Sequence, residues 1–217
     1  MSVWDDRLEA YRTSPTHVAG PDLDAIVALC EPAPGRTMLD VATGGGHVAR
    51  RLRAQGALVV SSDASPGMRP DVVTAAEHLP FADGSFDVVV TRVAAHHFDD
   101  VRAAVQEMAR VASESVVIGD MLYRTPEEDE AEKLRDPSHV RSLDAAEWRR
   151  LLEAAGMVVD HEELFARTHE FDSWLARTGC VGADAARVRE LLAPVSSADG
   201  TTWSNEFIVL RGRKGSR

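Results

Sequence analysis

Short apolar runs alternate with segments of helical periodicity through the first 120 residues of the chain. The runs are rich in β-branched residues, and the longest is almost continuously apolar, which is typical of parallel strands that helices cover on both faces. Strands are predicted at residues 37–41, 57–62, 71–74, 86–91 and 115–119. Helices are predicted at residues 4–11, 22–30, 46–55 and 99–110. This alternation predicts a doubly wound α/β fold around a mostly parallel sheet.

The alternation becomes looser after Asp120. Helices are predicted at residues 126–133, 143–155, 171–178 and 183–192, and strands at residues 157–164 and 206–211. The sheet then has seven predicted strands, and the last of them joins it late in the sequence. The length of 217 residues suits a single domain.

The composition is that of an ordinary globular protein, with 44% hydrophobic and 27% charged residues. The formal net charge of −11 argues against a nucleic-acid partner, because phosphate binding needs a basic surface, and a small-molecule substrate is expected instead. Cys30 and Cys180 are too few for a secreted disulfide framework and are expected as reduced thiols. The chain shows no signal-like start and no apolar run long enough for a membrane span. We therefore expect a cytoplasmic protein without a membrane partner, as a monomer or homodimer.

Residues 38–47 carry the clearest chemical signal in the sequence. An apolar run that contains Asp40 leads into three glycines at 44–46, and a helical pattern follows at once. Glycines allow a tight turn and a close approach to a ligand, and the first N–H groups of a helix can face an acceptor. With Asp63 at the end of the next apolar run, the pattern predicts a nucleotide-cofactor crevice.

Two kinds of cofactor compete for this crevice. Residues 44–49 satisfy the dinucleotide fingerprint G-x-G-x-x-G/A, and Asp63 follows about 20 residues later, which favours a nicotinamide cofactor. Asp40 favours the opposite interpretation, because a carboxylate repels a pyrophosphate and attracts a cationic amino or sulfonium group. The chain also lacks a second domain that would carry the hydride-transfer machinery.

Four ordered blocks extend this signal: residues 39–47 (LDVATGGGH), 62–68 (SDASPGM), 76–87 (AEHLPFADGSFD) and 92–98 (RVAAHHF). On these blocks the chain resembles the class I S-adenosylmethionine-dependent methyltransferases, in particular the small-molecule type related to quinone-biosynthesis C-methyltransferases. The likeness runs from about residue 11 to about residue 159. It implies a Rossmann-like doubly wound sheet of seven strands with an antiparallel last strand, which agrees with the strand count above.

The resemblance also implies how the single domain is organised and what it binds. Residues 1–35 would form N-terminal lid helices, residues 36–120 the cofactor-binding core, and residues 121–217 the substrate-side helices and the last two strands. The implied cofactor is S-adenosyl-L-methionine, with S-adenosyl-L-homocysteine as its product.

Individual residues take roles by the same resemblance. Asp40 would lie under the methionine amino group, and Asp63 would bind both ribose hydroxyls through charge-assisted hydrogen bonds. A helix cap before Ser65 is the alternative for Asp63. The predicted cofactor-binding residues are Tyr11, His17, Asp40, Ala42, Thr43, Gly44, Gly46, Asp63, Ala64, Met68, Ala76, Glu77, Arg92, Val93 and His97.

The chain departs from the family pattern at two positions. Ala42 stands where the first glycine of the loop is usual. Ala75 stands where related sequences often carry an acid that bonds the adenine amino group. Ala76 and Glu77 would then supply backbone contacts, although Glu77 could instead bond N–H groups of its own loop.

His96 and His97 follow strand 86–91, at the edge of the sheet where open α/β folds bind ligands. Either histidine could act as a general base, because its pKa lies near working pH. The alternative is that one packs and the other bonds backbone, and the sequence does not distinguish them. No metal site is predicted, since the acidic stretch 126–133 contains no histidine. Candidates for a substrate pocket are Met121, Tyr123, His139, Arg141, Trp174 and Trp203.

The sequence therefore favours methyl transfer from S-adenosylmethionine to a small-molecule carbon, oxygen or nitrogen nucleophile. A non-methylating protein on the same scaffold, either a binding module or a cofactor-retaining enzyme, is the alternative, because fold does not determine chemistry. An NAD(P)-dependent reductase is the third hypothesis, supported only by the literal fingerprint.

Overall fold

The computed structural model describes the backbone of residues 8–215, and the side chains of these residues except 8, 10, 11, 15 and 16. Its centre is a seven-stranded sheet with the order β3-β2-β1-β4-β5-β7-β6. The strands are β1 (Thr37–Val41), β2 (Leu58–Asp63), β3 (Val72–Val73), β4 (Phe86–Arg92), β5 (Ala112–Met121), β6 (Met157–Glu170) and β7 (Thr202–Lys214). The first five strands pair in parallel, and β7 runs antiparallel to both β5 and β6. The predicted mostly parallel sheet with an antiparallel last strand is thereby confirmed.

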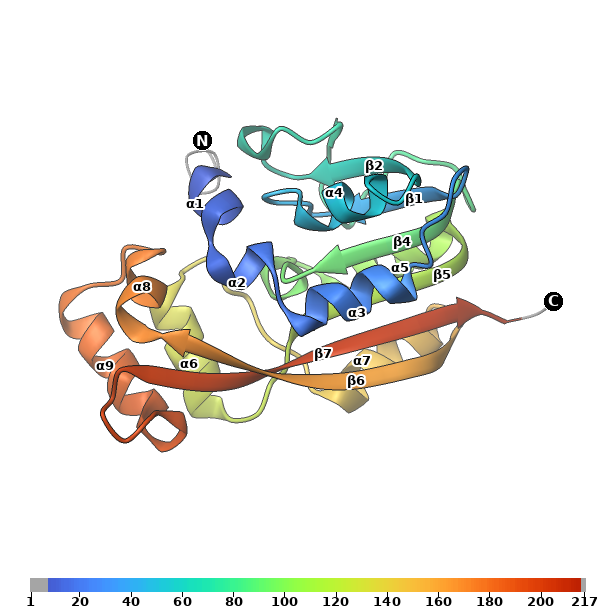
Figure 1. Cartoon of the computed structure of the whole chain (residues 1–217). Helices are drawn as coiled ribbons and strands as arrows, with labels where there is room; N and C mark the ends of the chain where they lie inside the picture. The colour runs from blue at the N-terminus through green and yellow to red at the C-terminus, as the bar shows by residue number, and fades with distance from the viewer. Residues whose placement is uncertain (1–7, 216–217) are drawn as a thin grey trace.

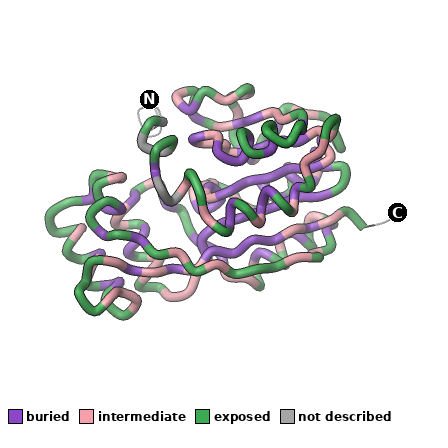
Figure 2. Tube along the Cα trace, in the orientation of Figure 1, coloured by how far each residue is buried: buried purple, intermediate pink, exposed green. Residues whose placement is uncertain are grey.

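Helices cover both faces of the sheet (Figure 1). One face packs against α3 (Pro21–Leu29) and α4 (His47–Arg53), and the other against α5 (Val101–Val111) and α7 (Ala145–Ala154). Successive residues of a strand point to opposite faces, so Val88 and Val90 of β4 lie in the first layer and Val89 in the second. Figure 2 shows the consequence, since the buried stretches follow the central strands.

Gly119 of β5 allows the helix α3 to lie close to the sheet. A Cβ atom at this position would stand 2.3 Å from Cδ1 of Ile26, a distance that side-chain carbons do not tolerate. The glycine therefore serves packing of the N-terminal helix against the strand rather than backbone conformation.

The antiparallel pair of β6 and β7, whose strands are connected through α8 (Phe171–Ala176) and α9 (Gly182–Leu192), is called the β6–β7 hairpin below. A smaller apolar cluster lies beyond the sheet, at the far end of this hairpin (Figure 1). It is formed by α6 (Pro126–Arg135), α8 and α9, which pack around the buried rings of Phe171, Trp174 and Trp203. The N-terminal helices α1 (Leu8–Thr13) and α2 (Pro15–Val18) precede α3, and the predicted helix at 4–11 is described only from Leu8 onwards.

Three strands are longer than predicted, and these limits need correction. β5 begins at Ala112 rather than 115, β6 extends to Glu170 rather than 164, and β7 begins at Thr202 rather than 206. β6 is an edge strand whose last four residues, Arg167, Thr168, His169 and Glu170, are polar, and Thr168 and Glu170 among them are exposed. Edge strands tolerate polar residues, so the apolar signal used for prediction ends before the strand does.

Cys30 and Cys180 are both buried free thiols, as predicted. Within residues 8–215, no helix is long and apolar enough to cross a membrane.

Candidate functional site

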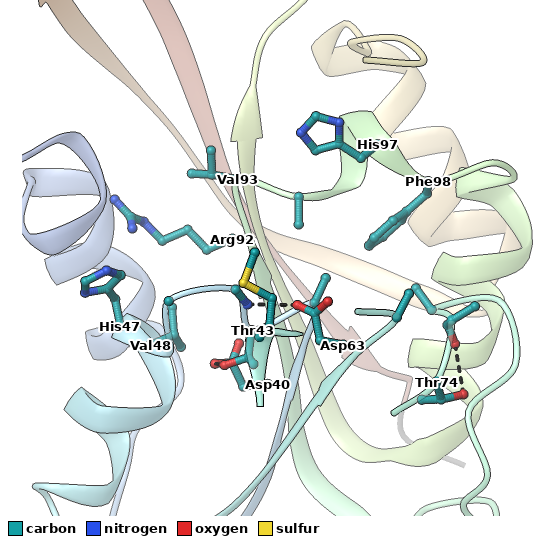
Figure 3. Close-up of a pocket in the computed structure, with 18 of the residues that line it drawn as sticks. Asp40, Thr43, His47, Val48, Asp63, Thr74, Arg92, Val93, His97 and Phe98 are labelled. Atoms are coloured by element: carbon teal, nitrogen blue, oxygen red, sulfur yellow. Dashed lines mark hydrogen bonds between the residues drawn. The ribbon is translucent and has the colours of Figure 1, made fainter. Parts of the chain in front are cut away.

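A cavity of about 210 Å³ opens at the carboxyl ends of β1, β2 and β4 (Figure 3). Each of these three strands supplies a polar side chain to the cavity, namely Asp40 from β1, Asp63 from β2 and Arg92 from β4. The other lining residues are His17, Ala42, Thr43, Gly44, Gly45, His47, Val48, Ala64, Met68, Thr74, Ala75, Ala76, Glu77, Val93, Ala94, His97, Phe98 and Asp99. Ligand sites of parallel α/β sheets lie at this edge.

The glycine-rich loop between β1 and α4 forms one wall of the cavity. Gly44 has a φ of 49° and Gly46 a φ of 73°, and Ala42 adopts the same left-handed region with a φ of 53°. Glycine adopts this region without a penalty, whereas the Cβ of alanine makes it unfavourable. The loop is closed by a hydrogen bond from Gly46 N to the carbonyl oxygen of Thr43, at 2.8 Å.

Asp40 is buried at the base of the cavity, where its side chain is 2% exposed. Its Oδ2 atom accepts hydrogen bonds from the Thr43 hydroxyl at 2.6 Å and from the Ala49 amide at 3.1 Å. Its Oδ1 atom accepts none from the described residues. Burial raises the pKa of Asp40 to about 6, because removal from water disfavours the charged form. This carboxyl group therefore has one oxygen bound to the loop and one available to a ligand.

Asp63 connects the loop to the next strand end. Its Oδ2 accepts the amide of Gly44 at 2.9 Å, and its Oδ1 accepts the amide of Ser65 at 2.9 Å. Burial raises its pKa, while the two amide bonds act in the opposite direction. The cap-like bond to Ser65 coexists with a place in the cavity wall, since each carboxylate oxygen has a second lone pair.

Carboxylates outnumber cations around the cavity. Asp40, Asp63, Glu77 and Asp99 line it, and Arg92 is the one arginine or lysine among the described lining residues. Arg92 is itself paired with the buried carboxylate of Asp22 at 2.8 Å. The cavity is therefore suited to a cationic ligand and repels a pyrophosphate.

An apolar wall of the cavity is made by Ala64, Met68, Ala76 and Phe98. Phe98 lies on the side of the cavity away from His47 (Figure 3). Glu77 lies at the edge of this wall, where Oε1 accepts the amide of Asp100 at 3.2 Å. The alternative that Glu77 bonds backbone of its own loop is therefore corrected, since its partner lies at the start of α5.

The two candidate histidines occupy different environments. His96 is buried, and its Nδ1 lies 2.6 Å from Oδ1 of Asp120, whose Oδ2 accepts the His96 amide. Burial opposes a charge on the His96 ring, but the Asp120 carboxylate outweighs it and raises the pKa of His96. Burial and the neighbouring His96 lower the pKa of His97 to about 3.

His97, in contrast to His96, lines the cavity. Its Nδ1 lies 2.9 Å from the carbonyl oxygen of Ser138, which can only accept a hydrogen bond. Nδ1 therefore carries the proton of the neutral ring, and Nε2 is its basic nitrogen.

Most residues predicted from the sequence meet in this one cavity. His17, Asp40, Ala42, Thr43, Gly44, Asp63, Ala64, Met68, Ala76, Glu77, Arg92, Val93 and His97 all line it. Gly46 does not, and instead its left-handed backbone begins α4. His96 lies behind the wall, and the side chain of Tyr11 falls outside the described residues. The lining residues outside the predicted set are Gly45, His47, Val48, Thr74, Ala75, Ala94, Phe98 and Asp99. Gly45, His47, Ala94 and Phe98 nevertheless belong to the blocks quoted above.

The substrate-pocket candidates are scattered. Met121 and Trp174 line a second, smaller cavity that adjoins this one. His139 is buried with Nε2 3.3 Å from Asp129, and Arg141 forms a surface ion pair with Glu147. Within the described part of the chain, no group of three or more histidine, cysteine or acidic side chains is arranged to hold a metal ion.

Comparison with known proteins gives the class. Residues 39–118 match the family model of the methyltransferase domain. The chain is 30% identical over 225 residues to the uncharacterized methyltransferase YcgJ of Bacillus subtilis (strain 168), and this alignment covers 93% of this chain and 87% of YcgJ. A demethylmenaquinone methyltransferase of Beutenbergia cavernae is 40% identical over 99 residues, or 41% of this chain and 40% of that protein.

Solved structures agree. The structure of YcgJ superposes with a TM-score of 0.82 at 25% identity and covers 90% of this chain and 99% of YcgJ. BH2331 of Bacillus halodurans C-125, assigned as a methyltransferase, superposes with a TM-score of 0.83 at 26% identity. The superposition covers 91% of this chain and 100% of BH2331. The chain belongs to the methyltransferase family, and it is an S-adenosylmethionine-dependent methyltransferase.

Proposed function

We propose that the cavity binds S-adenosylmethionine and that the enzyme transfers its methyl group to a small-molecule carbon, oxygen or nitrogen nucleophile. The observation that carries this proposal is the placement of Asp40 and Asp63 on both sides of the glycine loop, in a cavity with an excess of carboxylates. A cofactor that carries an ammonium and a sulfonium group matches that charge, and its ribose supplies two hydroxyl donors.

Different residues of the cavity bind different parts of the cofactor. Oδ1 of Asp40 accepts the ammonium group, and the Asp63 carboxylate accepts the ribose hydroxyls. The apolar wall with Ala64 and Phe98 packs against the adenine. The backbone at Arg92 and Val93 lies beside the methionine part, and the N-terminal segment with Tyr11 and His17 acts as a lid.

Methyl transfer requires the protein mainly to align the acceptor with the methyl group. When bound, the cofactor supplies a methyl group on a sulfonium, and the acceptor's electron pair forms the new bond as the carbon–sulfur bond breaks and sulfur keeps its pair. The protein holds the acceptor in line with that bond and excludes water. His97 lies nearest to this place of the two candidate bases, because it lines the cavity and His96 does not.

His97 suits an acceptor that becomes acidic only as it reacts. With a pKa lowered to about 3, its ring is neutral at working pH and a weak base. An alcohol or amine whose heteroatom is being methylated becomes far more acidic, so a weak base in contact can remove the proton.

The nicotinamide hypothesis is disfavoured by the same charges, since a dinucleotide pyrophosphate would face four carboxylates and one neutralised arginine. A non-methylating role is disfavoured by membership of the methyltransferase family.

The proposal is tested by titration calorimetry with S-adenosylhomocysteine on Asp63→Asn. Loss of a charge-assisted pair of hydrogen bonds predicts an affinity about tenfold or more below wild type. The matched control is Asp71→Asn, an acid directly before the neighbouring strand β3 that bonds Ser61 and Arg53 and does not line the cavity. Equal affinities of Asp63→Asn and wild type would overturn the proposed site.

A further inference from the structure

A second cavity adjoins the one described above. Its volume is about 40 Å³, and it shares the walls formed by His17, Val93 and His97 with the larger cavity. The remaining walls come from His96, from Met121 at the end of β5, from α6, from α8 and the residues after it, and from the far half of the β6–β7 hairpin. It therefore adjoins the place where the proposed function puts the transferred methyl group.

Three guanidinium groups line this smaller cavity, those of Arg135, Arg167 and Arg177. The side chains of Arg135 and Arg167 are only 10% and 12% exposed. The Arg167 guanidinium stacks over the ring of Phe207 at 3.7 Å, and Arg177 Nη1 donates to the Ser14 hydroxyl at 2.6 Å. Buried arginines held by rings and hydroxyls form rigid, preorganised donors.

The acids near these arginines are unevenly distributed. Arg167 and Arg92 share a single carboxylate, Asp22, at 2.7 and 2.8 Å. Arg135 faces Glu132 at 3.4 Å and Asp136 at 3.7 Å. Near His17, burial and the guanidinium groups of Arg177, Arg92 and Arg167 together lower the pKa of the imidazole, so three positive groups gather at this wall. The buried carboxylates of Asp22 and Asp120 both act on Arg167.

The pKa of His169 reflects the nearby arginines, whereas the pKa of Glu132 is set mainly by burial. Burial, together with the positive charges of Arg167, Arg177 and Arg135, lowers the pKa of His169 to about 3. Burial likewise raises the pKa of Glu132, which favours its neutral form, a hydrogen-bond donor. Glu132, the one acid among the described lining residues, is therefore favoured in a neutral form that can donate a hydrogen bond to an anion, although Arg135, His96 and Arg177 oppose the effect of burial.

Three buried polar atoms in the walls have no hydrogen-bond partner among the described residues: Arg135 Nε, Glu132 Oε1 and His169 Nδ1. Arg135 Nε, and the Glu132 carboxyl in its neutral form, can donate to an anion, whereas His169 Nδ1 is an acceptor because Nε2 donates to Asn205 Oδ1. The side chains of Glu132 and His169 are more than nine-tenths buried. A buried polar group without a partner costs about 1–3 kcal/mol, so native structures rarely keep several at one place without a ligand.

We propose that this cavity binds a carboxylate group of the methyl acceptor, and that the substrate of the enzyme is accordingly a small organic acid. The inference rests on the proposed function, because it places the reacting atom of that acid at the walls the two cavities share. About 40 Å³ corresponds to roughly three water-sized positions, which matches the three heavy atoms of a carboxylate. Guanidinium groups bind this planar anion through parallel hydrogen bonds.

The proposal is tested with matched acid and amide probes, namely benzoate against benzamide and hexanoate against hexanamide. Binding is measured by ligand-observed NMR on the full chain saturated with S-adenosylhomocysteine. Wild type is expected to bind one or both acids about tenfold more tightly than the matching amide. Arg177→Gln and Arg135→Gln are expected to lose this preference. Arg187→Gln changes an exposed arginine of α9 that pairs with Glu130 of α6, and this variant is expected to keep the preference for the acid.

Two outcomes would overturn the proposal: equal binding of acid and amide by wild type, or an acid preference that survives in Arg177→Gln and Arg135→Gln. The titration of S-adenosylhomocysteine on the same samples separates this failure from a failure of the proposed function. If wild type binds that product and prefers neither probe, the cofactor site stands and the organic-acid substrate is wrong. If wild type does not bind that product, the proposed function itself is wrong.

Discussion

Nε of Arg92 lies 2.8 Å from Oδ2 of Asp22, and both side chains are at most 4% exposed. The pair joins α3 to the end of β4 at the rim of the cavity, and Arg167 from the β6–β7 hairpin binds the same oxygen at 2.7 Å. One carboxylate therefore connects the N-terminal helices, the parallel core and the late hairpin.

Asp22→Asn is expected to destabilise the protein by about 3–5 kcal/mol, because it leaves two buried guanidinium groups facing a neutral side chain. Burial alone would raise the pKa of Asp22, but Arg167 and Arg92 outweigh it and hold the pKa below its ordinary value of 3.8. The stabilisation is therefore present above pH 3.8 and is lost as pH falls through the lowered folded-state pKa.

Urea denaturation at pH 7 measures this change. Asp24→Asn is the matched control, since Asp24 lies on the same helix and forms an exposed ion pair with Arg51. Exposed pairs contribute about 0–1 kcal/mol. Equal effects of the two substitutions would contradict the structural role given to Asp22.

Asp40→Asn is expected to stabilise the unliganded protein at pH 8. Burial raises the pKa of Asp40 from 3.8 to about 6, so the folded state binds more protons than the unfolded state in this interval. Wild-type stability therefore falls as pH rises from 3.8 to about 6, by up to about 3 kcal/mol. The asparagine can keep the bonds from Thr43 and Ala49. Denaturation should show about half of its advantage at pH 5 and the full advantage at pH 8.

The same substitution is expected to weaken binding of S-adenosylhomocysteine by about tenfold or more, because a neutral amide attracts an ammonium group less than a carboxylate does. Wild-type affinity should decrease as pH falls below about 6, where Asp40 becomes protonated, and Asp40→Asn should show a flatter profile. A wild-type affinity that does not change between pH 5 and pH 8 would mean that Asp40 does not contact the cofactor.

Ala42→Gly is expected to stabilise the protein by about 0.5–1 kcal/mol. An alanine in the left-handed region costs about 1–2 kcal/mol, and the added freedom of glycine in the unfolded chain offsets part of the gain. Ala54→Gly is the control, because Ala54 is exposed and has a φ of −62°, and there the substitution should be destabilising. Thermal denaturation of both variants settles the sign.

Ala75→Asp is expected to tighten binding of S-adenosylhomocysteine by about fivefold, or about 1 kcal/mol, by providing an acceptor for the adenine amino group. Ala75 is exposed and lines the cavity, so the larger side chain can be accommodated. Ala82→Asp adds the same charge at an exposed position outside the cavity. The adenine placement fails if both variants change the affinity equally.

The core of the site could be predicted because its signals are local. Asp40, Gly44 and Asp63 each end an apolar run or interrupt it, and parallel strands bring their carboxyl ends to one edge. Phe98 and Asp99 were missed although they directly follow His97, because their position depends on how the chain turns after β4.

The smaller cavity could not be predicted for a different reason. Arg167 and His169 lie on a part of β6 that the apolar pattern did not identify as strand, and Arg177 follows a helix carried by the same hairpin. Their approach to His17 and Val93 depends on the twist and length of that hairpin, which side-chain periodicity does not encode. The choice between His96 and His97 likewise required Asp120 and Ser138 in space.

The measurement that tests the central claim most directly is a calorimetric titration of the wild-type protein with S-adenosylmethionine, S-adenosylhomocysteine and NADH. We expect binding of the first two with micromolar affinity and no heat from the third, because the cavity presents carboxylates to a cation and offers a pyrophosphate no unpaired arginine. Binding of NADH without binding of either sulfur compound would contradict the assignment of this cavity to the methyl donor.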